Sequence, residues 1–349
     1  MKRSLLRDTA PEMRTRLPTD SLLDLLSRRI DEALRPLLQG YRICALLDFP
    51  NYSNVGDSAI WLGEERYLRS AGLKVTYRGE ASHYMAQGLE GKIGRALILL
   101  SGGGNLGDLY PTHQHFRERI IRSFPSHRII QLPQSIHFAD LPNLSHARAI
   151  FNAHPDLTLL VRDWKSLEIA RNEFRARSIL CPDMALALGP CGRPRPSATK
   201  TMWLARRETD PEVKYRILPE LRPGMERTDW WDDASSAVAL DETFRWLVVR
   251  YPRWSGLCRR AIRGSYRPFA RQRLARGLRL LARGEIVITD RLHGYILSLL
   301  MRIPHVVLDN SYGKVKSFHT TWTESSTITH WADSPEEALQ TAMELASER

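Results

Sequence analysis

Residues 285–301, EIVITDRLHGYILSLLM, carry the clearest structural signal in the sequence. An apolar run ends at Thr289, a polar cluster follows, and a second apolar run then has the length of a helix. This order predicts a buried strand at 285–289 that leads directly into a helix at 292–302. We therefore expect a strand–helix unit of the α/β class, with polar side chains at the point where the strand ends.

The same alternation of short apolar runs and helix-like segments fills the rest of the chain. In the first half, strands are expected at 42–48, 73–78, 95–100, 127–132, 157–161 and 177–181, and helices at 58–71, 112–123 and 163–175. In the second half, further strands are expected at 200–206 and 304–308, and helices at 241–250 and from Pro268 onward. Strands that alternate with helices favour a parallel sheet covered by helices on both faces.

The length of the chain and one linker predict two such domains. The 349 residues exceed the size at which one hydrophobic core usually keeps growing. GPCGRPRPSATK (189–200) holds three prolines and two glycines and is typical of a linker. We expect a helical lead-in at 1–40, a Rossmann-like domain at 41–190, a second Rossmann-like domain at 191–334 and a C-terminal helix at 335–349.

Composition excludes several classes of protein. A hydrophobic content of 43% with 26% charged residues is typical of a folded globular protein. No segment approaches the roughly 18 uninterrupted apolar residues of a membrane helix. The N-terminus has no apolar core of signal-peptide length, so we expect a cytoplasmic protein. The four cysteines lack CxxC spacing, and no His, Asp or Glu grouping has metal-ligand spacing, so neither a disulfide framework nor a metal is expected.

Two further segments place polar residues or glycines where a strand ends, and open parallel sheets bind ligands at such places. In DFPNYSNVGDSAI (48–60), Asp57 or Ser58 is expected to cap a helix whose first turn offers free N–H groups. In LILLSGGGNLGD (97–108), three consecutive glycines allow the backbone to approach a ligand closely. Each segment alone also fits an ordinary turn, and the glycine run matches neither GxGxxG nor a P-loop. The candidate ligand-binding residues of these segments are Asn54, Gly56, Asp57, Gly102, Gly103, Gly104 and Asn105.

A cationic and a titratable side chain stand at the third strand end, in TDRLHG (289–294). Arg291 is expected beside a helix N-terminus, where the helix dipole already favours an anion. Its guanidinium adds a bidentate fork for phosphate or carboxylate. His293, on the first helical turn, has a side chain that exchanges protons near neutral pH. Together the pair favours a site for a small anion over a purely structural role.

The chain resembles the polysaccharide pyruvyl transferase family over roughly residues 42–320. The resemblance rests on six motifs in a fixed order: NVGD (54–57), GGGN (102–105), RD (162–163), CPD (181–183), TDRLHG (289–294) and YGKVKSF (312–318). It implies two Rossmann-like domains with mainly parallel sheets, arranged as in GT-B glycosyltransferases. It also implies phosphoenolpyruvate as co-substrate without a further cofactor, and a sugar acceptor with two suitably placed hydroxyls.

The resemblance further implies roles for particular residues. Those expected to bind the donor are Arg291, Leu292 and His293, which match the family's RLH segment, and Arg206 or Arg207 from WLARRE. Lys314 and Lys316 follow the strand expected at 304–308 and are expected to reach the cleft, with a solvated lysine as the alternative. His293 is the expected acid/base. Either this histidine serves both proton transfers, or a carboxylate such as Asp57 handles the sugar hydroxyl. The aspartates of the RD and CPD motifs also fit structural roles, Asp163 as the cap of the helix that starts at Trp164 and Asp183 as a residue that orders the turn after Pro182.

Nine arginines and no acids lie between Cys258 and Gly284, so the rest of the chain carries only +3 of the net charge of +12. A helix from Pro268 would place leucines on one face and arginines on a solvated opposite face. In the alternative interpretation, Arg259–Arg283 contacts the inner face of the cytoplasmic membrane or holds the diphosphate of a polyprenyl-linked acceptor. Nucleic acid is not expected, because few aromatic residues interleave with the arginines.

These observations favour an enzyme that moves a pyruvyl group from phosphoenolpyruvate to a sugar of an exopolysaccharide repeat unit as a cyclic ketal. One alternative is a nucleotide-sugar glycosyltransferase of GT-B shape, which needs a ribose-binding acid in the second domain that the sequence does not reveal. The other is a non-catalytic glycan- or anion-binding protein, which the Arg291–His293 pair disfavours.

Overall fold

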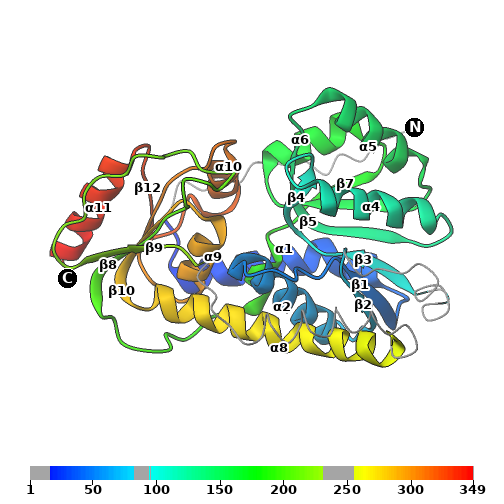
Figure 1. The fold of residues 1–349 in the computed structure, drawn as a ribbon, viewed down its shortest axis with the longest axis horizontal. Helices are drawn as coiled ribbons and strands as arrows, with labels where there is room; N and C mark the ends of the chain where they lie inside the picture. Colours follow the sequence, from blue (N-terminus) through cyan, green and yellow to red (C-terminus); the bar gives the residue numbers. More distant parts are fainter. Residues whose placement is uncertain (1–15, 82–93, 95, 231–254, 349) are drawn as a thin grey trace.

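The computed structural model describes residues 16–81, 94, 96–230 and 255–348, of which 255–261 are described by their backbone alone. The described chain forms two α/β halves, each built around one sheet (Figure 1). The sheet of the N-terminal half has the strand order β2-β1-β3-β5-β6-β7, and β4 pairs with the far end of β5. Its strands are β1 (Ile43–Leu47), β2 (Lys74–Gly79), β3 (Leu97–Leu100), β4 (Gly103–Gly107), β5 (Ile129–His137), β6 (Leu157–Val161) and β7 (Arg177–Leu180).

The sheet of the C-terminal half has the order β12-β11-β10-β8-β9. Its strands are β8 (Thr199–Leu204), β9 (Met225–Thr228), β10 (Gly284–Thr289), β11 (His305–Val307) and β12 (Thr329–Trp331). Every strand pair recorded among the described residues of both sheets is parallel. The predicted fold class, α/β with two mainly parallel sheets in a GT-B-like arrangement, is confirmed.

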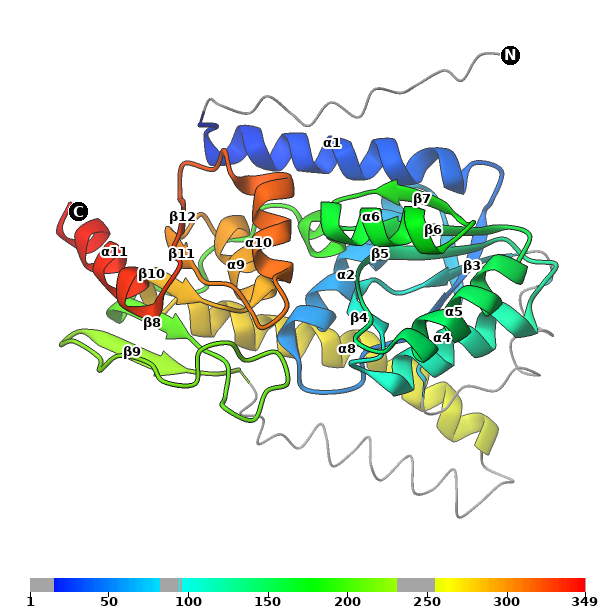
Figure 2. The ribbon, with the colours of Figure 1, turned by 90° about the horizontal axis from the view of Figure 1, so that it is seen from above.

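Helices cover both sheets, as the alternating sequence pattern predicts (Figures 1 and 2). In the N-terminal half they are α1 (Thr19–Leu38), α2 (Val55–Ser70), α4 (Pro111–Ser123), α5 (Leu141–Ala153), α6 (Trp164–Glu173) and the short 3-10 turn η1 (Met184–Leu188). In the C-terminal half they are α8 (Ser255–Leu281), α9 (Leu292–Leu300), α10 (Lys314–Phe318), the π turn η3 (His319–Thr323) and α11 (Pro335–Ser347). The helix expected at 241–250 lies outside the described residues.

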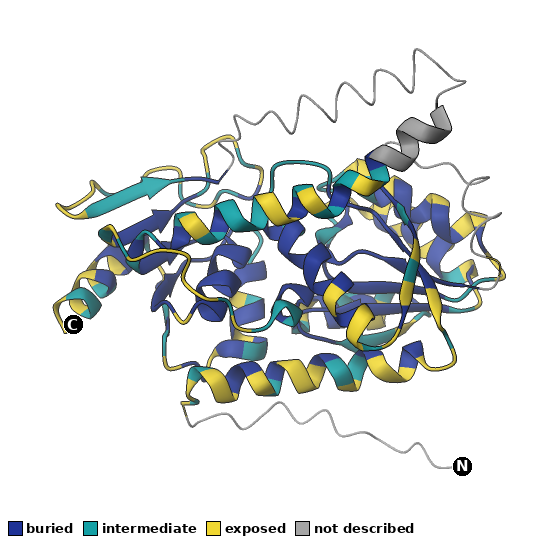
Figure 3. Cartoon of the chain, turned by 90° about the horizontal axis from the view of Figure 1, so that it is seen from below, coloured by how far each residue is buried: buried dark blue, intermediate teal, exposed yellow. Residues whose placement is uncertain are grey.

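Successive residues of the central strands enter different hydrophobic cores, because side chains alternate between the two faces of a strand. In β1, Cys44 and Leu46 join a core with α1 and α2, whereas Ala45 and Leu47 join one with α4, α5 and α6. The first core continues into the C-terminal half, where it takes in residues of β8, α8 and α9. One core therefore holds the two halves together, and Figure 3 shows the inner strands of both sheets as buried, whereas the edge strand β9 is of intermediate burial.

Helix α8 lies along both halves and differs from the helix that the sequence predicts (Figure 1). It begins at Ser255 and runs through Pro268 instead of opening near this proline. The predicted solvated basic face is partly wrong, because Arg273 Nη1 donates to the Pro50 carbonyl at 3.1 Å and Arg276 Nη2 donates to the Ser53 carbonyl at 2.7 Å. Hydrophobic periodicity reveals which face of a helix is apolar but not which other segment covers its polar face.

Helix α1 also connects the two halves (Figure 2). Near its start, Asp20 Oδ1 accepts a hydrogen bond from Arg302 Nε at 2.9 Å, and Arg302 follows α9 of the C-terminal half. Further along, Asp31 Oδ1 accepts from the Tyr67 hydroxyl of α2 at 3.0 Å. None of the helices in the described parts of the chain is both long and apolar enough to cross a membrane.

Two glycines of α8 provide a matched test of its packing. A Cβ on Gly277 would lie 2.3 Å from Val55 Cγ1, whereas a Cβ on Gly264 would meet nothing within 4 Å. We expect Gly277→Ala to lower the free energy of unfolding by about 1–3 kcal/mol through overpacking. Gly264→Ala should raise it by about 0.5–1 kcal/mol, because alanine favours a helix. Denaturant unfolding of both variants measures this, and equal stability of the two would contradict the packing of α8 on α2.

Candidate active site

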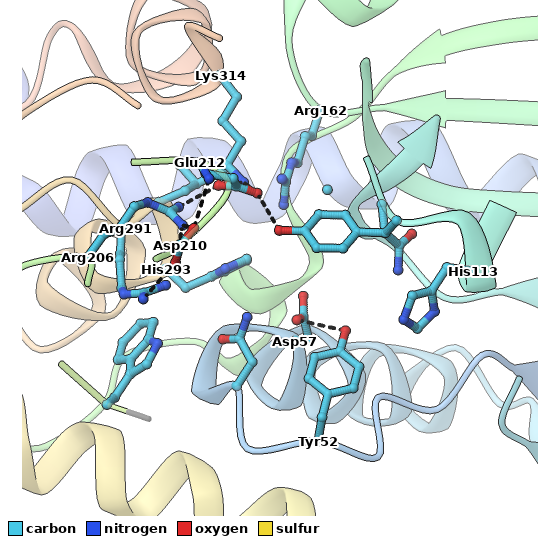
Figure 4. Close-up of a pocket in the computed structure, with 16 residues that line it drawn as sticks. Tyr52, Asp57, His113, Arg162, Arg206, Asp210, Glu212, Arg291, His293 and Lys314 are labelled. Carbon is cyan, nitrogen blue, oxygen red and sulfur yellow. Dashed lines mark hydrogen bonds and ion pairs between the residues drawn. The ribbon is translucent and has the colours of Figure 1, made fainter. Parts of the chain in front are cut away.

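A cavity of about 230 Å³ lies where the carboxyl ends of the two sheets face each other (Figure 4). The N-terminal half contributes Tyr52, Asn54, Asp57, Gly104, Asn105, Tyr110, His113 and Arg162. The C-terminal half contributes Arg206, Asp210, Glu212, Trp230, Arg291, Leu292, His293 and Lys314. The residues that the sequence proposes as site residues and that line this cavity are Asn54, Asp57, Gly104, Asn105, Arg206, Arg291, Leu292, His293 and Lys314.

The remaining candidates from the sequence lie around the cavity and do not line it. Gly56 packs on His293, since a Cβ there would lie 2.3 Å from His293 Nδ1. Gly102 donates its N–H to the buried Glu64 carboxyl at 2.7 Å, and burial raises the pKa of Glu64 to about 8. Gly103 has a φ of 138°, which favours glycine. Arg207 is exposed, so Arg206 is the arginine of the WLARRE segment that lies in the cavity.

The N-terminal loop caps α2 with a different residue from the ones predicted. Asn54 is the N-cap of α2, and its side chain accepts a hydrogen bond from the Gly56 N–H at 2.9 Å. The prediction of Asp57 or Ser58 as the cap is wrong, because the helix begins three residues earlier than the apolar pattern indicates. Asp57 is left on the first turn, where its Oδ2 accepts from the Tyr52 hydroxyl at 2.9 Å.

Arg291 is the N-cap of α9, and its guanidinium is held by carboxylates of the protein. Its Nε and Nη2 donate to the two carboxylate oxygens of Asp229 at 2.8 and 2.7 Å, and Nη2 also donates to Asp210 at 3.0 Å. The guanidinium lies 5.6 Å from the ring centre of Trp230. The Arg291 guanidinium, which the sequence predicts to bind an external anion, is thus already hydrogen-bonded to two carboxylates of the protein. These contacts hold the residues around the first turn of α9 in place.

Arg206 and Lys314 share the carboxylate of Glu212. Arg206 Nη2 lies 2.5 Å from Glu212 Oε2, and Lys314 Nζ lies 2.6 Å from Oε1. Burial by itself would raise the pKa of Glu212, but Arg206 and Lys314 outweigh burial and hold this pKa well below its usual range. Burial lowers the pKa of Lys314 to about 8 even though Glu212 opposes that change. The lysine therefore titrates just above neutral pH.

Asp183 joins Arg162 to His293 on the other side of the cavity. Arg162 Nη1 lies 2.5 Å from Asp183 Oδ2, and His293 Nε2 lies 3.4 Å from the same oxygen. Burial would raise the pKa of Asp183, but His293 and Arg162 outweigh it and lower the pKa. Asp183 also orders its own turn by accepting from the Ala185 N–H, and Asp163 caps α6 by accepting from the Ser166 N–H, both at 2.8 Å.

Two cationic groups converge above the backbone of Gly104. A Cβ at this position would lie 2.8 Å from Arg162 Nη2 and 3.3 Å from Lys314 Nζ. Arg162 Nη2 has no hydrogen-bond partner among the described residues, whereas Nη1 and Nε are bound to Asp183 and Ser135. Because Gly104 carries no side chain, Arg162 Nη2 and Lys314 Nζ can both lie close to its backbone at the edge of the cavity.

The sequence interpretation misses several residues of the cavity. One is His113, whose Nδ1 lies 2.8 Å from Oδ1 of the buried Asp48. Burial would lower the pKa of His113, but Asp48 outweighs burial and raises it. Asp48 directly follows β1 and has a φ of 70°, a strained conformation that a functional position commonly retains. The position of Asp48 at the end of a strand is the sequence feature that could have pointed to this pair.

In the described part of the chain, no group of three or more His, Cys, Asp or Glu side chains is arranged to hold a metal ion. The cavity instead offers arginine, lysine and histidine donors, ordered by carboxylates. Such a set suits a small organic anion with more than one charged group.

Comparison with known proteins agrees with this chemistry. The model of the polysaccharide pyruvyl transferase family matches residues 54–312. The chain is 31% identical over 341 residues to Pyruvyl transferase 1 of Schizosaccharomyces pombe, a match that covers 93% of this chain and 81% of that protein. It is 34% identical over 288 residues to EpsO of Bacillus subtilis, which carries the provisional name of pyruvyl transferase, with 79% of this chain and 84% of EpsO covered.

A solved structure of an uncharacterized protein from Klebsiella pneumoniae has the same fold, with a TM-score of 0.59. Its sequence is 18% identical, and the match covers 88% of this chain and 99% of that one, so the likeness concerns the fold alone. The family match spans most of both sheets and all of the cavity residues except Tyr52 and Lys314. The chain belongs to the polysaccharide pyruvyl transferase family.

Proposed function

We propose that this protein transfers a pyruvyl group from phosphoenolpyruvate to a sugar of an exopolysaccharide repeat unit and forms a cyclic ketal. The observation that supports this most strongly is the convergence of Arg162 Nη2 and Lys314 Nζ above Gly104, within a cavity that also contains the first turn of α9. Phosphoenolpyruvate has a phosphate and a carboxylate at opposite ends of a short rigid unit. A cavity with two separate groups of donors fits such a molecule.

In the proposed complex, the phosphate lies above Gly104 between Arg162 and Lys314. The carboxylate lies toward the first turn of α9, where the backbone N–H groups and the helix dipole favour an anion. Arg206 and Arg291 are both bound to carboxylates and act by holding this arrangement in place. Donors that are fixed before the substrate arrives need little reorganisation during the reaction.

The reaction in this proposal has two steps. First, His293 gives a proton to C3 of the enol while a sugar hydroxyl attacks C2, so the C2–C3 double bond becomes a single bond with a methyl group at C3. Second, a neighbouring hydroxyl attacks C2, and the C2–O bond to phosphate breaks. One hydroxyl proton replaces the proton given to C3, and the other leaves with the phosphate. In this proposal the reaction uses no metal and no further cofactor.

Two groups in the cavity are suited to take the hydroxyl proton. Asp57 is on the first turn of α2, and His113 is oriented by Asp48. We expect Asp57→Asn and His113→Gln to separate them: the variant that loses turnover but still binds phosphoenolpyruvate identifies the base. If both variants keep parental turnover, neither residue is the base and His293 serves both transfers.

The function is tested by incubating the protein with phosphoenolpyruvate and a panel of oligosaccharides that carry free diols. The proposal predicts release of inorganic phosphate in equal amount to a sugar product with the added mass of a pyruvate ketal. Calorimetric titration of phosphoenolpyruvate tests the donor independently of the acceptor. Turnover of a nucleotide sugar together with no binding of phosphoenolpyruvate would overturn the proposal in favour of a glycosyltransferase.

Gly104→Ala tests the proposed phosphate position. The added methyl group would fill the space between Arg162 and Lys314, and both neighbours are ends of flexible side chains, so the fold should persist. We expect the Kd for phosphoenolpyruvate to rise at least about tenfold, or about 1.4 kcal/mol. Gly192→Ala is the control, because a Cβ at Gly192 would meet nothing within 4 Å. Equal donor affinity in the two variants would exclude the site above Gly104.

The pH dependence of donor use tests Lys314. Since burial lowers the pKa of this lysine to about 8, its charge is present below that pH and is lost above it. We expect kcat/KM for phosphoenolpyruvate to fall as the pH rises through about 8, because this parameter reports ionisation of the free enzyme. In Lys314→Arg, which stays charged, the fall should move to higher pH. If kcat/KM of Lys314→Arg still falls at about the same pH as in the parent protein, the titrating group would instead be Glu64, whose pKa is also raised to about 8.

A further inference from the structure

Arg117 is a buried cation that has no carboxylate bound to it in the described part of the chain. It belongs to α4, is 1% exposed and packs against β4. Its Nε donates to Gln131 Oε1 at 2.6 Å, and its Nη1 donates to Gln114 Oε1 at 3.1 Å and to the Asn105 carbonyl oxygen at 3.3 Å. Its Nη2 donates to Asn105 Oδ1 at 2.8 Å. Each of these acceptors is a neutral amide oxygen.

The charge of Arg117 indicates a role beyond packing. Burial of a charge without an ion partner costs free energy, and arginine is rarely buried unless it is paired. Burial lowers the pKa of Arg117 to about 10 although Asp48 and Glu118 oppose this change, so the side chain stays charged at neutral pH. An apolar side chain of similar volume would avoid the cost. Two of the four hydrogen bonds lead to Asn105, which lines the active-site cavity.

These contacts fix the orientation of the Asn105 carboxamide. Its Oδ1 accepts from Arg117 Nη2 and from Gln134 Nε2, both at 2.8 Å. A guanidinium only donates, so the atom facing Arg117 is the amide oxygen. The backbone N–H of Asn105 donates to Gln134 Oε1 at 3.1 Å, which holds the main chain as well. Asn105 Nδ2 lies on the other side of the carboxamide and has no hydrogen-bond partner among the described residues.

We propose that Asn105 Nδ2 donates a hydrogen bond to a phosphate oxygen of the donor, and that Arg117 is the positioning residue that orients this amide. The proposal rests on the proposed function, because it adds a contact to the phosphate placed above the neighbouring Gly104. A cation bound to the oxygen of an amide polarises it and strengthens its N–H donors. Such a donor favours an oxygen with negative charge over a sugar hydroxyl. Arg117 thus acts on the anion through Asn105 and does not touch it.

Inorganic phosphate is the probe, because its binding requires neither the acceptor nor the reaction. In calorimetric titrations of the full-length protein, we expect Asn105→Ala to raise the Kd for phosphate at least about tenfold. Asn105→Asp should do the same, since it has no N–H donor but keeps an oxygen for Arg117 and Gln134 and should therefore fold. Asn172→Asp is the matched control, because Asn172 is exposed on α6 and does not line the cavity. This control should bind phosphate as the parent protein does.

A double-mutant cycle tests the role of Arg117. Arg117→Lys keeps the charge but lacks the planar fork that holds both oxygens of Asn105. We expect it to raise the Kd for phosphate about fivefold in the parent protein and to leave the Kd unchanged in Asn105→Ala, because the two residues act as one unit. A purely structural effect of the lysine would weaken binding equally in both backgrounds. Denaturant unfolding checks that each variant is folded during the titration.

Four results would contradict the proposal. One is a parent protein that does not bind phosphate, and another is equal weakening by Arg117→Lys in both backgrounds. The third is weak binding by Asn105→Asp with parental binding by Asn105→Ala, which shows an effect of added charge alone. The fourth is a higher KM for the acceptor sugar in Asn105→Ala with parental phosphate binding, which places the amide at the acceptor. Failure of phosphoenolpyruvate to react, with phosphate binding still dependent on Asn105, would count against the proposed function alone.

Discussion

Arg162, Arg206, Arg291 and Lys314 carry positive charge into a cleft where little solvent reaches their side chains. A buried cation is stable only if an anion is fixed close to it, and removal of one partner of such a pair commonly costs about 3–5 kcal/mol. Asp183, Glu212 and Asp229 supply these anions. Their carboxylates are therefore part of the framework of the site. For the same reason, loss of Arg291 would leave Asp229 unpaired and weaken the fold as well as the site.

This compensation also decides how the site recognises a ligand. Most of the guanidinium and ammonium hydrogen bonds in the cleft go to carboxylates of the protein, so a general excess of positive charge does not define the binding position. The binding position is set by the few donors that have no hydrogen-bond partner among the described residues, above all Arg162 Nη2 beside Gly104. Recognition then depends on geometry, and a rigid anion with two charged ends is better suited to it than a flexible one.

The sequence predicts the α/β class, the two parallel sheets and the junction at 289–294, because all of these follow from hydrophobic periodicity and from polar residues at strand ends. It does not predict Asp210, Glu212 or Asp229, because Asp210 and Glu212 lie in an irregular loop that carries no periodic signal and Asp229 follows β9, a short strand that the sequence does not predict. It also cannot show that α8 covers the N-terminal half, since the contact between Gly277 and Val55 joins residues more than two hundred positions apart in the sequence. Arg162 and Lys314 illustrate the same limit: each stands in a recognisable motif, but only the fold brings their side chains together over Gly104.

A crystal structure of the protein with phosphoenolpyruvate bound tests the proposed binding mode most directly. We expect phosphate oxygens within hydrogen-bonding distance of Arg162 Nη2 and Lys314 Nζ above Gly104, and the carboxylate toward the first turn of α9. Phosphoenolpyruvate bound outside this cleft, or bound with its phosphate away from Gly104, would contradict it.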